Sequence, residues 1–205
     1  MVDTPATPDS TSNTTPPTNN GLSGNAQQRV DAILGEYVNR VRNAGAMSFQ
    51  DETRTFERVT AIVVEDMDRA DGYRDGRIHK SDLERRLNQS MSAFQARSGS
   101  NSPFPWETQN AMLAKLPDVI SADQLLHTIN DWHARHPGEA RTWDRNKDGK
   151  IDNREDPQLV RHTQDLIDRV KQSPLQVMEA GLRELGEHPS PSTPGAASGR
   201  RQGRG

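Results

Sequence analysis

Apolar residues recur through the middle of the chain with the spacing of helices that bury one face. The first stretch follows a polar N-terminal segment, and its apolar positions are Val30, Ile33, Leu34, Tyr37, Val38 and Val41. These positions lie three or four residues apart, so they form one stripe along a helix. Stretches with similar spacing lie at 56–67, 83–94, 125–132, 159–170 and 175–185. The pattern predicts an all-α fold.

Breaks between these stretches predict where the helices end. Residues 98–105 are rich in Ser, Asn and Pro and are interpreted as a linker. Pro137-Gly138 is expected to end the helix that includes residues 125–132. Pro157 is compatible with the next helix only in its first turn. Ser173-Pro174 is expected to cap and start the last helix.

One of the segments between predicted helices carries oxygen-bearing side chains at a fixed spacing. Residues 144–155 read DRNKDGKIDNRE. A calcium ion takes six to eight oxygen ligands, which a short loop supplies only if alternate side chains converge on one point. The expected ligands are Asp144, Asn146, Asp148, the carbonyl of Lys150, Asp152 and Glu155. Gly149 lies where the chain must turn with positive φ.

These twelve residues resemble the calcium loop of the EF-hand family. The resemblance implies that Glu155 closes the ligand shell with both oxygens, and that Ile151, at the eighth position, packs against its counterpart in a second loop. The alternative is an acidic turn held by local hydrogen bonds, because Asp, Asn and Gly are common in turns. Three aspartates, the glycine, the apolar eighth position and the final glutamate favour calcium binding.

A second segment, residues 71–82, follows the same pattern with substitutions. Its weaker candidate ligands are Asp71, Tyr73, Asp75, the carbonyl of Arg77 and Asp82. Tyr73 replaces an expected oxygen donor, and Asp82 is one methylene shorter than glutamate. Asp68 is a further candidate if the loop begins earlier. We therefore expect weaker calcium binding here than at 144–155, or none.

Two degenerate copies complete an internal repeat. Their eighth positions are Met47 and Ile120, so the four equivalent residues lie at 47, 78, 120 and 151, with gaps of 31, 42 and 31. The equal gaps predict two EF-hand pairs, 25–97 and 106–187, joined by a linker at 98–105. The repeat resembles four-EF-hand proteins of the bacterial calerythrin-like and sarcoplasmic calcium-binding type.

Composition limits the folded part of the chain. Of 205 residues only 31% are hydrophobic, and the two ends, 1–24 and 188–205, have few apolar residues to bury, so we expect both to be disordered. Net charge is −3 with both signs mixed, which gives no support for nucleic-acid binding. No run is long and apolar enough to predict a membrane span or a cleavable secretion signal. Cysteine is absent.

The sequence therefore predicts a Ca²⁺-binding protein without enzymatic activity. Our first interpretation is a calcium-responsive sensor that binds a protein partner still to be identified. The alternative is a calcium buffer or a calcium-stabilised structural protein. The Ser/Thr/Pro-rich N-terminus is similar to the secretion segments of bacterial type III effectors, and this resemblance implies secretion without a cleavable signal and delivery into a host cell. The alternative is a cytoplasmic protein, because tails of this composition also occur in ordinary cytosolic proteins. Export of a reporter fused to residues 1–25 would test delivery. His133 and His136 lack the acidic partner of a metalloprotease motif, and we interpret them as surface residues.

Overall fold

The computed structural model describes residues 21–98, 106–136 and 139–187. In chain order the elements are α1 (Gly24–Ala44), β1 (Ala46–Ser48), α2 (Phe49–Asp68), β2 (Arg77–His79), α3 (Lys80–Ser98), α4 (Trp106–Lys115), β3 (Val119–Ser121), α5 (Ala122–Arg135), η1 (Glu139–Trp143), β4 (Lys150–Asp152), α6 (Leu159–Gln172), η2 (Pro174–Met178) and α7 (Glu179–Glu187). The structure is mainly helical, as the apolar spacing predicts. The proposed C-terminal tail, and the proposed linker apart from Ser98, lie outside the described residues.

The structure describes residues before the predicted boundary at residue 24. Leu22 is fully buried, and Ser23 caps α1 by accepting a hydrogen bond from the backbone N–H of Ala26 at 3.3 Å. The Ser23 hydroxyl also donates to the carboxylate of Asp66, and the Ser23 N–H donates to the same carboxylate at 2.9 Å. The expected N-terminal tail therefore ends before Leu22, because this apolar residue and its neighbour both have partners in the fold.

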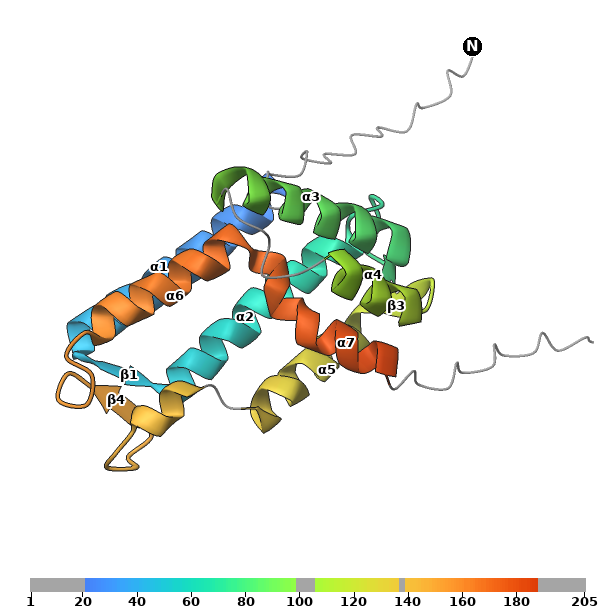
Figure 1. Ribbon diagram of the computed structural model, residues 1–205. Coiled ribbons are helices and arrows are strands. Elements are labelled where there is room, and N and C mark those ends of the chain that lie inside the picture. The colour runs from blue at the N-terminus through green and yellow to red at the C-terminus, as the bar shows by residue number, and fades with distance from the viewer. Residues whose placement is uncertain (1–20, 99–105, 137–138, 188–205) are drawn as a thin grey trace, which may run out of the picture.

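The core lies where α1, α2, α5, α6 and α7 contact one another. Helix α2 packs against both α1 and α5, α1 packs against α6, and α5 packs against α7 (Figure 1). The apolar stripe predicted for α1 is buried along its length. Helix α7 approaches α5 closely through Gly181, since a Cβ at that position would lie 2.3 Å from the Ile129 side chain. In the part of the chain described, no helix is long and apolar enough to cross a membrane.

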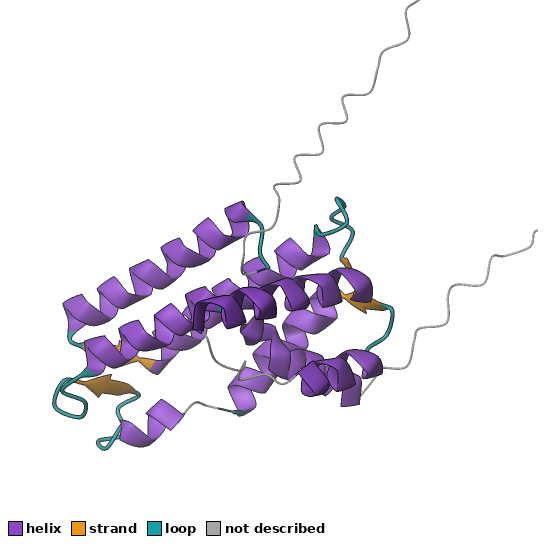
Figure 2. Ribbon diagram, turned by 45° about the horizontal axis from the view of Figure 1, so that its top comes forward, coloured by secondary structure: helices purple, strands orange, loops and turns teal. Residues whose placement is uncertain are grey.

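Four short strands form two separate antiparallel bridges, visible at opposite ends of the molecule (Figures 1 and 2). In the first bridge, β1 pairs with β4 and Met47 lies opposite Ile151. In the second bridge, β2 pairs with β3 and Ile78 lies opposite Ile120. All four of these side chains are buried. Each bridge thus joins one degenerate segment to one glycine-containing segment.

The pairing differs from the predicted pairs of consecutive loops at 25–97 and 106–187. Helix α2 is a single element of 20 residues, about 30 Å long, and it separates β1 from β2. Residues 49–68 contain neither Gly nor Pro, so nothing in the sequence interrupts this helix. Because β1 and β2 lie at opposite ends of α2, each must pair with a strand from the second half of the chain.

Equivalent backbone hydrogen bonds flank the two bridges. The N–H of Phe49 donates to the Gly149 carbonyl at 3.1 Å, and the N–H of Ala122 donates to the Gly76 carbonyl at 2.9 Å. On the other side of each bridge, Asn153 donates to Gly45 at 3.2 Å and Lys80 donates to Asp118 at 2.9 Å. All four bonds join a residue two positions after one bridge centre to a residue two positions before the opposite one. The two bridges therefore have the same pattern of backbone hydrogen bonds.

Candidate metal-binding loop

The loop at residues 144–155 lies at the end of the molecule that holds the first bridge. It follows the five-residue 3₁₀ segment η1 directly, and its seventh to ninth positions form strand β4. Two of its residues adopt positive φ, Lys147 at 60° and Gly149 at 82°. A Cβ at Gly149 would meet nothing within 4 Å, so only the backbone conformation favours glycine there.

Backbone N–H groups turn toward the acidic side chains at the start of the loop. Asp144 accepts from the N–H of Asp148 at 3.1 Å and from the N–H of Gly149 at 3.0 Å. Asn146 also accepts from the N–H of Asp148, at 2.9 Å. Asp148 in turn accepts from the N–H of Lys150 at 3.0 Å. These bonds fold the first half of the loop around the predicted ligand side chains.

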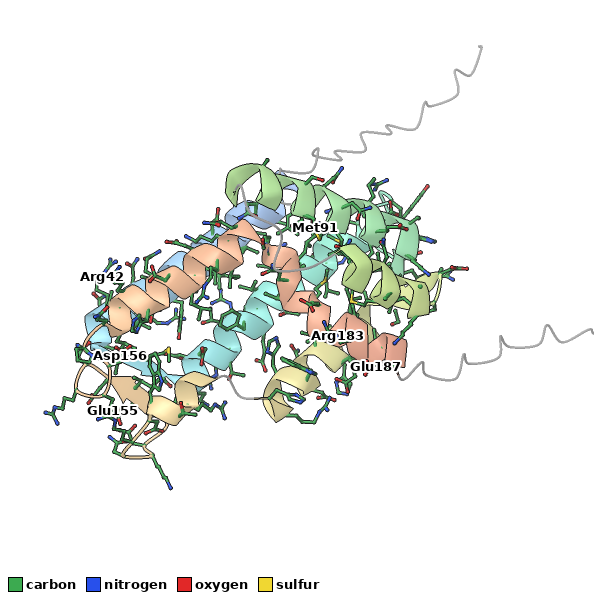
Figure 3. All side chains as sticks on the ribbon, viewed as in Figure 1. Arg42, Met91, Glu155, Asp156, Arg183 and Glu187 are labelled. Carbon is green, nitrogen blue, oxygen red and sulfur yellow. The ribbon has the colours of Figure 1, made fainter. Side chains whose placement is uncertain are left out.

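Acidic side chains in the second half close the loop. Asp152 accepts from the N–H of Arg154 at 2.7 Å and from the N–H of Glu155 at 3.2 Å. One oxygen of Glu155 accepts from the N–H groups of Arg145 at 2.8 Å and Asn146 at 3.2 Å, and its other oxygen accepts from Asp152 at 3.3 Å. Glu155 therefore reaches back across the loop, and Figure 3 labels its position.

The predicted ligands share one loop without forming a gathered cluster. Among the described residues, no three His, Cys, Asp or Glu side chains come together closely enough to hold a metal ion. The physical reason is that Asp144, Asp148, Asp152 and Glu155 direct oxygens toward backbone N–H groups of the loop. Metal binding would require several of these oxygens to turn toward a common point.

The loop carries no net charge. Its acidic residues are Asp144, Asp148, Asp152 and Glu155, and its basic residues are Arg145, Lys147, Lys150 and Arg154, so 4 − 4 = 0. All four basic residues are exposed. Their positive charges reduce the attraction of a divalent cation to the loop, an effect that solvent and salt weaken but do not abolish.

Asp156 and Pro157 change how the chain leaves the loop. The next helix, α6, begins only at Leu159, so Pro157 precedes the helix instead of lying in its first turn. The buried Asp156 accepts from the N–H of Gln158 at 2.9 Å and lies 2.8 Å from Nδ1 of His162. The His162 ring in turn lies 5.5 Å from that of Trp143, which immediately precedes the loop. These contacts connect the entrance and the exit of the loop.

The acidic side chains of the loop at residues 71–82 contact backbone N–H groups and basic side chains. Asp71 accepts from the N–H of Tyr73 at 2.9 Å and lies 3.5 Å from the His79 ring. Asp82 forms an ion pair with Arg85 at 2.5 Å. Asp75 accepts from the N–H of Arg77 at 3.1 Å, and the Tyr73 side chain is exposed.

Asp68 holds this second loop from the end of α2. Its buried carboxylate accepts from the N–H of Arg77 at 2.8 Å, shorter than the bond from the same N–H to Asp75. Glu65 forms ion pairs with Arg29 at 3.0 Å, with Arg69 at 2.9 Å and with Arg74 of the loop at 3.5 Å. Asp68, the last residue of α2, thus holds the loop at the Arg77 N–H, and Asp82 lies in the first turn of α3.

The two candidate histidines do not share a role. Nε2 of His133 is buried without a partner, and burial lowers the pKa of this imidazole. His136 is exposed, stacks on Trp132 with ring centroids 4.5 Å apart, and places Nδ1 at 2.9 Å from the Trp132 carbonyl. His133 is therefore half-buried, contrary to the prediction of a surface residue, while His136 agrees with it.

Contacts of Arg141 and His162 were not predicted from the sequence. Arg141 lies over the Phe49 ring at 5.2 Å, more than 90 positions away along the chain, so no local pattern indicates the contact. Asp156 before Pro157 is a turn signal, and it could have suggested the bond to Gln158.

Comparisons with protein families, with curated proteins and with solved structures each found no match to this chain.

Proposed function

We propose that this chain is a calcium-binding protein whose site is the loop at 144–155. The observation that carries the proposal is the fold of the loop itself. Asp144 accepts hydrogen bonds from the N–H groups of Asp148 and Gly149, Gly149 has positive φ, and Ile151 lies in a two-strand bridge. The backbone of a loop held in this way already turns at the glycine as the ligand spacing requires, and an ion would draw the side-chain oxygens toward a common point.

The donor set suits a hard divalent cation. Asp144, Asn146, Asp148, Asp152, Glu155 and the Lys150 carbonyl would supply oxygen ligands, and the loop contains no thiol or imidazole. When bound, Ca²⁺ would supply positive charge at the centre of the loop. The chain's own residues would exchange some of their N–H hydrogen bonds for the ion. Because the loop is neutral overall, we expect weaker binding than in loops with a large negative charge.

We further propose that calcium acts on the fold through the first bridge. Strand β4 is part of the loop, and its partner β1 leads directly into α2. A change in the loop would therefore act on the first turn of a long core helix. This favours a calcium-responsive module, acting on a protein partner, over a buffer that binds the ion and barely moves. The buffer or calcium-stabilised structural protein remains the alternative outcome of the test.

The test is a calorimetric titration of the full chain with Ca²⁺ in excess Mg²⁺, with circular dichroism and thermal melting in parallel. We expect binding at 144–155 and a higher melting temperature with Ca²⁺ than with chelator, because a ligand of the folded state stabilises it. Glu155→Gln should weaken this binding at least about 10-fold, since it removes a charged ligand.

Asp82→Asn is the matched control. Asp82 occupies the same final loop position but pairs with Arg85, so we expect this variant to titrate like the parent chain. Binding without a change in helicity or melting would favour the buffer. No heat of binding in the parent chain, or equal effects of the two substitutions, would refute the assignment of the site.

A further inference from the structure

In the described residues, no long helix leads directly into loop 144–155, unlike in an ordinary helix-loop-helix unit. Helix α5 ends at Arg135, and the element next to Asp144 is the five-residue segment η1. A short 3₁₀ segment has poor hydrogen-bond geometry and little stability of its own. Something outside η1 must therefore fix where Asp144 lies.

Contacts with the first turn of α2 meet this need. The Arg141 guanidinium in η1 lies 5.2 Å from the centre of the Phe49 ring, within the range of a cation–π interaction. Glu52, also in the first turn of α2, is half-buried, and burial raises the pKa of its carboxyl while the charge of Arg141 acts in the opposite direction. Arg141 is thus attracted to two side chains of α2.

Phe49 also contacts the loop from its other side. Its backbone N–H donates to the Gly149 carbonyl at 3.1 Å, next to the expected carbonyl ligand, Lys150. One residue therefore holds the entrance of the loop through its ring and the middle of the loop through its backbone. The equivalent residue at the second bridge, Ala122, makes the same backbone bond to Gly76 but has no ring.

We infer that Phe49 and Arg141 are positioning residues for the loop at 144–155, supplied by the degenerate segment that pairs with it. They touch no ion themselves. The Phe49 ring and the Arg141 guanidinium hold η1 against α2, and this contact fixes Asp144 relative to Gly149. The inference rests on the proposed function for its calcium consequence, but the contact orders the loop whether or not an ion is bound.

The experiment compares Phe49→Leu and Arg141→Gln with matched controls on the full chain. Phe49→Leu keeps the backbone N–H and removes the ring. Phe56→Leu makes the same substitution two turns along α2, and Arg58→Gln removes an exposed arginine that pairs with Glu36 at 3.9 Å. Arg141→Lys keeps the positive charge and should restore part of any loss.

The first measurement is amide hydrogen exchange of residues 143–149 in chelator. We expect exchange to be about 2- to 5-fold faster in Phe49→Leu and Arg141→Gln than in the controls, which corresponds to one cation–π contact at an exposed site. The second is the Ca²⁺ titration, where we expect affinity to fall by a similar factor. The double variant should lose less than the product of the single losses, because both substitutions remove the same contact.

The two measurements separate the inference from the proposed function. Exchange in the two variants equal to that in Phe56→Leu and Arg58→Gln overturns the positioning role, whatever calcium does. Faster exchange in a chain that gives no heat with Ca²⁺ supports the positioning role and refutes the calcium site. Faster exchange with unchanged calcium affinity overturns the claim that the contact serves ion binding.

Discussion

A buried ion pair holds the segment that leads into α1. Arg86 and Asp66 lie 2.5 Å apart, with side chains 8% and 9% exposed, and Arg86 also donates to the Gly21 carbonyl at 3.2 Å. Asp66 in addition accepts from Ser23. The pair and its hydrogen bonds join the start of α1 to α2 and α3. Breaking it should therefore destabilise the fold more than breaking an exposed pair.

Replacing Arg86 by Met should lower the free energy of unfolding by about 3–5 kcal/mol, since Asp66 would be left buried without its charge partner. Arg183→Met is the control. Arg183 pairs with Glu179 at 2.7 Å but is 52% exposed, so its loss should cost less than about 1 kcal/mol. Urea unfolding of the two variants measures both values. Similar losses would show that the buried pair has no special role.

Single residues of the candidate site were predictable where local chemistry limits the choice. The oxygen-bearing residues of 144–155 and the glycine with positive φ follow from the sequence because the loop is local. The orientation of their oxygens does not, because backbone N–H groups compete for the carboxylates once the loop folds. The contacts of Arg141 and His162 depend on other elements, so no sequence pattern contains them.

At the scale of elements, the apolar spacing predicted the helices but not every boundary. The predicted last helix is in fact η2 followed by α7, and Ser173 makes no capping hydrogen bond. Pro157 lies before α6, because Asp156 forms a turn with Gln158. A cap or a turn depends on a few hydrogen bonds, whereas a buried stripe depends on the packing of many apolar side chains. The stripes are therefore the more predictable feature.

Close packing of α5 and α7 gives a test of element geometry. Gly181→Ala should lower the free energy of unfolding by about 1–3 kcal/mol, because the new methyl would overlap the Ile129 side chain. Gly35→Ala is the control, because a Cβ at Gly35 in α1 would meet no atom within 4 Å. It should raise stability by about 0.5–1 kcal/mol through helix propensity. Thermal or urea unfolding of both variants reports the difference. A stabilised Gly181→Ala would mean that the helices are further apart than described.

At the scale of the whole molecule, the repeat was visible in the sequence but its partners were not. Equal gaps of 31 residues suggested that neighbouring loops pair. The same gaps are also compatible with a helix that separates the two loops of each half. The deciding feature is the uninterrupted α2, which keeps β1 and β2 apart. The spacing alone therefore predicts which residues occupy equivalent positions, but it does not predict which strands pair.

Cross-linking can test the pairing, since the chain has no cysteine of its own. Ser48 lies opposite Lys150 in the first bridge. The double variant Ser48→Cys with Lys150→Cys should therefore form an intramolecular disulfide under mild oxidation, because paired residues in antiparallel strands lie within reach of one. The control joins Ser48→Cys to Arg77→Cys, which would be opposite each other if consecutive loops paired. Mass spectrometry after proteolysis identifies the link. A disulfide in the control alone would contradict the fold.

The nested pairing also orders events in time. Met47 and Ile151 are 151 − 47 = 104 positions apart, whereas Ile78 and Ile120 are 120 − 78 = 42 apart. Contacts between distant residues form more slowly, because more of the chain must be arranged first. While the chain is being synthesised, β2 can find β3 well before β4 exists, and β1 must wait with its edge unpaired. We therefore expect the bridge that supports the candidate site to be the last to close, which leaves β1 exposed to pairing with other chains until β4 has been synthesised.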